Sequence, residues 1–188
     1  MSGAIFYATR YGSTRDYAHW IAKATGLEAF DMDDGAQALQ RCDFVVLGCP
    51  VIYHKLLGSK WIRRHLDEIS RKPVILFTVS GAMADAKLDG WIANSLPQNL
   101  IDHAHHFALG GRQNPKELTL FDRTMLIVGG LFNPDRKAGR EELKGFDFMD
   151  KASIQPVVDL IERWKSGEAA KAPPGHDTKN QGNASPGN

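Results

Sequence analysis

Short apolar runs separated by helix-like segments are the feature that most limits what this chain can fold into. Residues 44–48 and 73–79 are almost continuous runs of apolar side chains, as expected of strands that are covered on both faces. Residues 4–8, 27–32 and 104–109 predict further strands, and helical patterns lie between most successive runs. This alternation predicts an α/β fold, in which a parallel sheet carries helices on both faces.

The predicted helices place apolar side chains on one face at helical spacing. In the first of them, which follows residue 14, Tyr17, Ala18, Ile21 and Ala22 fall on one side. The other helices are expected at residues 36–41, 59–69, 85–96, 118–132 and 153–164.

The length of 188 residues suits one domain with a substantial core. We assign residues 1–165 to this domain. Residues 166–188 are rich in glycine, alanine, proline, asparagine and lysine, so we expect them to form a disordered tail.

A polar loop at residues 9–14, between the first strand and the first helix, is the strongest functional signal. Backbone N–H groups at the start of a helix have no partners within it, and the helix dipole is positive there. The loop adds three hydroxyl groups, a glycine that permits close approach and an arginine, so it predicts a phosphate site. The alternative is that Ser13 or Thr14 only caps the helix. The predicted phosphate-binding residues are Thr9, Arg10, Tyr11, Gly12, Ser13 and Thr14.

Two further loops are expected beside this one, because the carboxyl ends of parallel strands meet at one edge of a sheet. The loop after residue 48 is apolar and aromatic, and the loop at residues 80–81 is small enough to approach the edge of a ring. The glycine patterns of dinucleotide folds and of ATP or GTP hydrolases are absent. A flat ring with one phosphate satisfies all three loops, and FMN fits better than an adenine nucleotide. The ring contacts are expected from Pro50, Val51, Ile52, Tyr53, His54, Thr78, Val79, Ser80 and Gly81.

Composition and single residues narrow the function further. A formal net charge of +1 gives no sign of a nucleic-acid partner. Cys42 and Cys49 flank a predicted strand, too far apart for a disulfide, which fits a reducing cytoplasm. The first residues carry no signal-peptide pattern, and no apolar run is long enough to span a membrane. The histidines at 103, 105 and 106 lack an acidic or cysteine partner at usable spacing, so no metal site is predicted.

Four marks of a known family are found in YATRYGST at 7–14, GCPVIY at 48–53, GGR at 110–112 and LFDRTM at 120–125. The first is similar to the phosphate loop of flavodoxins, and together they resemble the flavodoxin-like protoporphyrinogen IX dehydrogenase family. The resemblance implies a doubly wound five-stranded sheet, a helical insertion before the last helix and non-covalent FMN. It also implies oxidation of a tetrapyrrole, a step of heme biosynthesis, with electrons passed to a quinone. The chemistry is then at flavin N5, and no side chain is predicted to be catalytic.

Several roles are left open by the sequence. Arg112 is a candidate for binding a substrate carboxylate, and the alternative is an ion pair that holds the inserted segment. The apolar stripe within residues 118–131 suits a core, a homodimer contact, or contact with the inner membrane surface to reach quinone.

The alternative function is an electron carrier that works with a redox partner protein and has no substrate of its own. Carriers of the flavodoxin family are usually strongly acidic, whereas this chain has 23 Lys+Arg against 22 Asp+Glu. A third reading, an interaction domain that has lost its flavin, conflicts with the intact 9–14 loop.

Overall fold

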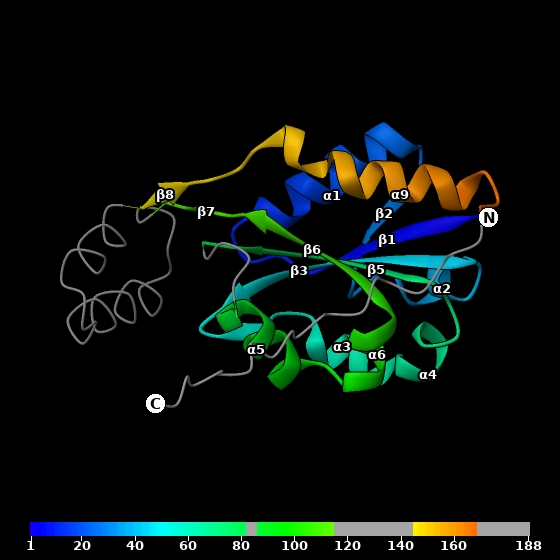
Figure 1. Cartoon of the computed structure of the whole chain (residues 1–188), viewed down its shortest axis with the longest axis horizontal. Helices are drawn as coiled ribbons and strands as arrows, with labels where there is room; N and C mark the ends of the chain where they lie inside the picture. The colour runs from blue at the N-terminus through cyan, green and yellow to red at the C-terminus, as the bar shows by residue number, and fades with distance from the viewer. Residues whose placement is uncertain (82–85, 115–144, 169–188) are drawn as a thin grey trace, which may run out of the picture.

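A parallel sheet forms the centre of the molecule, as the sequence predicts (Figure 1). The computed structural model describes residues 1–81, 86–114 and 145–168. Because the chain passes from β1 first to one side of the sheet and then to the other, the fold is doubly wound, and strand order reverses between β1 and β3. In spatial order the five parallel strands are β2 (Glu28–Asp31), β1 (Gly3–Tyr7), β3 (Phe44–Ile52), β5 (Val74–Ser80) and β6 (Ala104–Gly110).

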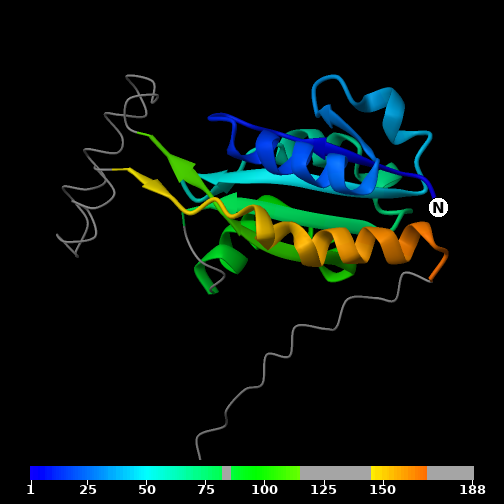
Figure 2. The same cartoon turned by 90° about the horizontal axis from the view of Figure 1, so that it is seen from above.

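Helices cover both faces of this sheet, which confirms the predicted architecture (Figures 1 and 2). One face carries α1 (Ser13–Thr25) and α9 (Gln155–Lys165), which lie against each other. A short 3₁₀ turn, η1 (Lys151–Ile154), leads into α9. The opposite face carries α2 (Ala36–Leu39), α3 (Ser59–Arg64), α4 (Leu66–Ile69), α5 (Ala86–Ser95) and α6 (Gln98–His103).

The sheet separates two hydrophobic cores, and its strands supply side chains to both in alternation. In β3, Val45 and Leu47 enter the core under α3–α6, while Phe44 and Val46 enter the core under α1 and α9. All four are completely buried. This two-sided burial is the physical reason for the continuous apolar runs in the sequence. In α1, Tyr17, Ala18 and Ile21 are fully buried as well, so its predicted apolar face is confirmed.

Strand β3 is longer than expected, and the predicted loop at residues 49–54 is wrong for its first four residues. Pro50, a residue that usually ends strands, pairs with Val79 of β5. Its missing N–H would point to the side where β1 has already ended, so no ladder bond is lost there. The Pro50 carbonyl instead accepts a hydrogen bond from the Leu57 N–H at 2.9 Å, and β4 (Lys55–Leu56) pairs antiparallel with the end of β3.

Two helical regions also differ from the expectation. The helix predicted at 59–69 is broken at His65, whose ring Nδ1 lies 2.9 Å from the Trp61 carbonyl oxygen. Helix α6 was not predicted, because it is short and lacks a helical apolar pattern. Consequently His103 ends a helix, whereas His105 lies in β6.

A two-stranded hairpin leaves the carboxyl end of β6. It pairs β7 (Arg112–Gln113) with β8 (Phe146–Asp147), two strands that the sequence does not predict. The predicted helical insertion at 118–132 lies outside the described residues, as do residues 169–188 of the predicted tail. Residues 166–168 close the end of α9 through backbone hydrogen bonds. Within the described ranges, no helix has the length and apolar character that crossing a membrane requires.

Candidate functional site

The 9–14 loop is held in shape by its own first residue. Gly12 has φ 88°, a left-handed conformation that favours glycine, and it occupies the N-cap position of α1. The Gly12 N–H donates to Thr9 Oγ1 at 3.1 Å. No side chain of the described residues caps the helix, and the N-cap is Gly12, so the alternative role of Ser13 or Thr14 as a helix cap is wrong. Both residues instead lie in the first turn of α1, among N–H groups that lack acceptors within the helix.

Thr14 carries a buried hydroxyl without a partner. The residue is 1% exposed, and among the described residues Oγ1 has no hydrogen-bond partner. An unsatisfied buried hydroxyl destabilises a fold by about 1–3 kcal/mol, so folding alone does not account for it. An anionic oxygen at the start of α1 would satisfy both this hydroxyl and the free N–H groups. The loop therefore fits a phosphate.

Arginine side chains add positive charge around the loop. The Arg10 guanidinium lies over the Tyr11 ring, 5.8 Å from its centroid. Arg15 folds back toward the loop, because a Cβ placed on Gly12 would lie 3.3 Å from Arg15 Nη2. Arg112 reaches the same turn from β7, with Nη2 3.4 Å from Asp16 Oδ2. Sequence reasoning did not single out Arg15, because a lone charged residue on a helix resembles an ordinary solvated side chain.

The second predicted loop is a tight turn with an unusual backbone. Tyr53 and His54 join β3 to β4, and their φ values are 50° and 62°. A two-residue hairpin with both φ angles positive is a type I′ turn, which normally carries Asn and Gly. For bulky side chains this conformation is strained, and such strain concentrates at functional sites. The His54 ring stacks on Trp91 of α5, with centroids 4.8 Å apart, while Tyr53 is 44% exposed.

The third predicted loop is only partly available for a ligand. Thr78 is buried, and its Oγ1 lies 2.9 Å from His106 Nε2, so its hydroxyl already has a partner within the sheet. The Ser80 carbonyl accepts from the Gly111 N–H at 2.7 Å. Gly81 leaves space for a neighbour, because a Cβ there would come within 2.4 Å of the Phe146 ring. Phe146 stacks on the half-exposed Phe148, and this aromatic pair beside Gly81 was not predicted.

The three loops lie at one edge of the sheet, and two sets of contacts connect the first loop with its neighbours. Ser13 contacts the main chain of Arg112, just beyond the end of β6. A Cβ on Gly58, close to the β3–β4 hairpin, would lie 3.1 Å from Ala8, which directly precedes the loop. Tyr17 reinforces this edge, because its hydroxyl donates to the Gly110 carbonyl and accepts from the Asp150 N–H, each at 3.0 Å. The described part of the chain thus gathers every predicted site residue near the carboxyl ends of the strands.

The cysteines and histidines take structural positions. Both cysteines are free and buried, and burial raises the pKa of each thiol, most strongly that of Cys49 inside β3. The His105 ring lies edge-on to Trp164 at 5.6 Å. No group of three or more metal-ligating side chains occurs among residues 1–81, 86–114 and 145–168.

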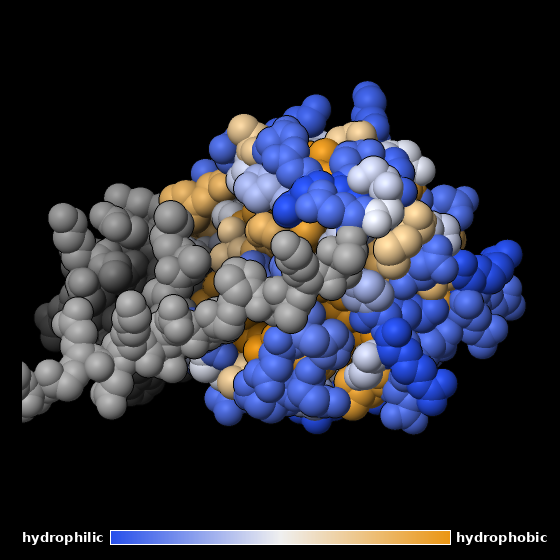
Figure 3. All heavy atoms as spheres, turned by 45° about the vertical axis from the view of Figure 1, so that its right-hand side comes forward, coloured by the Kyte–Doolittle hydropathy of each residue, from blue (hydrophilic) through white to orange (hydrophobic). Residues whose placement is uncertain are grey.

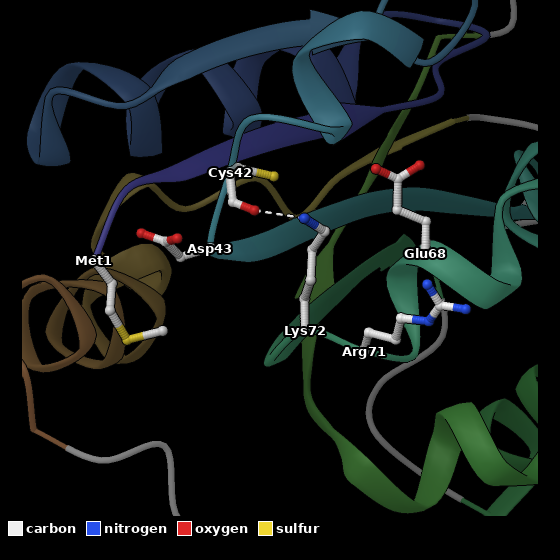
Figure 4. A pocket seen from close by; sticks show the side chains of 6 residues that line it. All are labelled: Met1, Cys42, Asp43, Glu68, Arg71 and Lys72. Atoms are coloured by element: carbon white, nitrogen blue, oxygen red, sulfur yellow. Dashed lines mark hydrogen bonds between the residues drawn. The ribbon is translucent and has the colours of Figure 1, made fainter.

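A surface hollow of about 810 Å³ lies at the opposite edge of the sheet (Figure 4). Here Lys72 Nζ donates to the Cys42 carbonyl at 2.6 Å, as the dashed line marks. In Figure 3, which brings this edge forward, hydrophilic residues make up most of the coloured surface. The hollow contains none of the predicted site residues. Its lining consists of Met1, Cys42, Asp43, Glu68, Arg71 and Lys72.

Comparison with known proteins agrees with the predicted flavodoxin-like fold. Residues 4–128, about two thirds of the chain, match the family model described as Flavodoxin domain. No match was found among curated proteins.

Solved structures with a similar fold include a two-electron reduced flavodoxin from Megasphaera elsdenii, at 22% identity and a TM-score of 0.42, over 58% of this chain and 82% of that one. They also include a flavodoxin from Fusobacterium nucleatum bound to FMN, at 13% identity and a TM-score of 0.40, over 57% of this chain and 68% of that one. A flavoprotein from Lactobacillus acidophilus in complex with FMN is 14% identical with a TM-score of 0.41, over 58% of this chain and 92% of that one. The assignment rests on the family model, which also supports the predicted FMN cofactor. The chain belongs to the flavodoxin-domain family.

Proposed function

We propose that this protein is an FMN-dependent oxidoreductase that passes electrons from a planar, apolar substrate to a quinone. The observation that carries the proposal is the 9–14 loop, in which a left-handed Gly12 precedes a helix start whose buried Thr14 hydroxyl has no partner in the part of the chain that the structure describes. The match to the flavodoxin domain supports a redox role. The motifs shared with the protoporphyrinogen IX dehydrogenase family favour a tetrapyrrole as the substrate.

Each part of the site has a role in this proposal. Ser13, Thr14 and the first N–H groups of α1 would hold the phosphate of FMN, and Gly12 lets it approach the backbone. The turn at Tyr53 and His54 would flank the ring. The backbone at residues 78–81 would face its polar edge, and Phe146 would limit access of water from that side. Bound FMN would supply the electron transfer through ring N5, so the chain contributes binding and orientation and needs no side-chain acid or base.

Exposed apolar side chains at this edge of the sheet support an apolar reaction partner. Tyr53 is 44% exposed and Phe148 is 54% exposed, in a protein whose described apolar side chains are mostly buried. Aromatic surfaces of this kind suit stacking with a flat ring. The near balance of acidic and basic residues fits a small apolar partner better than a strongly basic protein partner. The predicted homodimer and membrane contacts involve residues 118–131, outside the described ranges, and stay predictions.

The second candidate function is a flavodoxin-type electron carrier without its own substrate, and membership of the flavodoxin-domain family favours it. Reoxidation of the reduced protein distinguishes the two. Menaquinone, ubiquinone and oxidised ferredoxin should be mixed with it in parallel stopped-flow experiments. Fast turnover with a quinone supports the oxidoreductase, whereas fast transfer to ferredoxin alone supports the carrier. The cofactor is identified by extraction and chromatography, and recovery of FAD, or of no flavin after reconstitution, would contradict the proposal.

A further inference from the structure

Arg112 contacts the first turn of α1 in two ways. Its guanidinium Nη2 lies 3.4 Å from Asp16 Oδ2, and Arg15 Nη2 lies 3.8 Å from the other oxygen of the same carboxylate. The Arg112 N–H also donates to Ser13 Oγ at 3.3 Å. Residues far apart in the sequence therefore meet at the start of one helix, beside the Thr14 hydroxyl, which has no partner within residues 1–81, 86–114 and 145–168.

The Asp16 carboxylate would repel a phosphate bound at the start of α1. A carboxylate in the first turn is stabilised by the helix dipole, but it repels a phosphate dianion close by. Arg15 and Arg112 both lie within ion-pair distance of Asp16, so the group of three carries a net positive charge. The Arg112 side chain is 39% exposed and Asp16 is 32% exposed, so solvent weakens this ion pair. The guanidinium can thus interact with an anion as well as with Asp16.

The main chain of Arg112 orients the Ser13 hydroxyl. A hydroxyl has one proton to donate and two lone pairs that accept. Ser13 Oγ accepts from the Arg112 N–H, while its distance to the Arg112 carbonyl oxygen is 3.5 Å, which is long for an O–H···O bond. The proton can therefore turn to a phosphate oxygen while the hydroxyl keeps its bond to the Arg112 N–H.

We infer that Arg112 is a positioning residue of the phosphate site, which supplies charge through its guanidinium and orients Ser13 through its main chain. This role is an alternative to contact with a substrate carboxylate, and it rests on the proposed binding of FMN. It also couples the cofactor to the β7–β8 hairpin, because the same residue belongs to both. Filling the phosphate site is then expected to hold the hairpin against the 9–14 loop.

The test compares FMN with riboflavin, which has the same ring but no phosphate. Titration of apoprotein with each flavin, followed by fluorescence quenching, gives a ratio of affinities that reports on the phosphate alone. For Arg112→Gln we expect the FMN affinity to fall about tenfold while the riboflavin affinity stays constant, since one charge-assisted interaction is removed. Arg112→Lys should retain most of the ratio because the charge remains. The matched control is Arg71→Gln, which removes an arginine from the hollow at the opposite edge.

Asp16→Asn separates a charge role from a merely structural one. If Arg112 only ties β7 to α1, then Arg112→Gln and Asp16→Asn break the same ion pair and should both weaken both flavins. If Arg112 supplies charge to the phosphate, Asp16→Asn removes a repulsive carboxylate and should raise FMN affinity severalfold. Equal FMN-to-riboflavin ratios for wild type and Arg112→Gln would overturn the inference, as would parallel losses in both variants. A wild-type chain that bound neither flavin would overturn the proposed function, and the inference with it.

Discussion

The two edges of the sheet differ in where their unpartnered polar groups lie and in the strain of the backbone beside them. At the amino edge, the Asp43 carboxylate accepts from the Ser2 N–H at 2.7 Å and from the Ser2 hydroxyl at 3.0 Å, and Lys72 is bonded to the Cys42 carbonyl. At the carboxyl edge, the Thr14 hydroxyl has no partner among the described residues, and the turn at Tyr53 and His54 is strained. Ser70 Oγ and His103 Nε2, at the ends of α4 and α6 near the amino edge, also have no partner among the described residues. The carboxyl edge differs because its unpartnered hydroxyl lies at the start of a helix, close to a strained turn.

This contrast shows that a surface hollow is a weaker guide to function than a buried polar group without a hydrogen bond at a helix start, close to a strained turn. The hollow at the amino edge has a volume of about 810 Å³, yet two of its side chains, Asp43 and Lys72, are already used in hydrogen bonds of the fold. The candidate site is identified instead by a combination of features that reduce stability: the Thr14 hydroxyl at the start of α1, unpartnered among the described residues, and two left-handed residues close by. Natural folds keep such features where function requires them.

The largest expected effect is that of removing the Thr14 hydroxyl. Thr14→Val keeps the shape and β-branching of the side chain, so it should leave apoprotein unchanged or stabilise it by about 1 kcal/mol. FMN affinity should fall roughly ten- to a hundredfold, because a bond to the phosphate is lost. Titration with FMN and urea unfolding of apoprotein give the two numbers. Retained FMN affinity together with a strongly destabilised apoprotein would show that Thr14 serves the fold.

A smaller effect is expected from relief of strain in the turn. Tyr53→Asn places a residue that tolerates the left-handed conformation at φ 50°, so apoprotein should gain about 0.5–1 kcal/mol in unfolding free energy. FMN affinity should fall at the same time if Tyr53 flanks the ring. Leu57→Asn is the control, because Leu57 is similarly exposed at 36% and is not among the residues with positive φ. If the unfolding free energy changed equally in both variants, the gain would come from removing an exposed apolar side chain and not from relieving strain.

The smallest effect concerns the amino edge and its response to acid. Hydrogen bonds from Ser2 lower the pKa of Asp43 below its ordinary value. A carboxylate with a lowered pKa in the folded state stabilises the fold above its unfolded pKa, and this contribution is lost as the pH falls through the folded pKa. The apoprotein should therefore lose stability below about pH 4 more steeply than Asp43→Asn. Urea midpoints at pH 7, 4 and 3 measure the difference. Asp43→Asn should leave the ratio of FMN affinity to riboflavin affinity at pH 7 unchanged. A change in this ratio would contradict the view that the two edges act separately.

The sequence predicted those parts of the fold that depend on local pattern. The buried parts of β3 and β5 were visible as apolar runs, because these strands are covered on both faces and tolerate few polar residues. The extension of β3 through Pro50 was not visible, since it depends on where the neighbouring strand β1 ends. Strands β7 and β8 are two residues long and pair across about thirty residues, so neither has a pattern of its own.

The candidate site follows the same division between local and distant information. The 9–14 loop was predicted because its hydroxyl groups, glycine and following helix are adjacent in the sequence. The contact of Ser13 with Arg112 joins residues 99 positions apart, and the position of Phe146 against Gly81 depends on the β7–β8 pairing. Arg15 directly follows the 9–14 loop in the sequence, but its contribution of positive charge to the loop depends on its side-chain conformation, which brings the guanidinium close to Gly12. The sequence position alone does not predict that conformation.

The pairing of Arg112 with Asp147 and of Gln113 with Phe146 also has an evolutionary consequence. This pairing holds Gln113 next to Phe146. The length of the chain between these two residues can therefore change without moving the sheet. Closing a loop twice as long would add only about 0.6 kcal/mol of entropic cost. Related chains can therefore carry segments of different length and composition here while the 9–14 loop keeps its conformation.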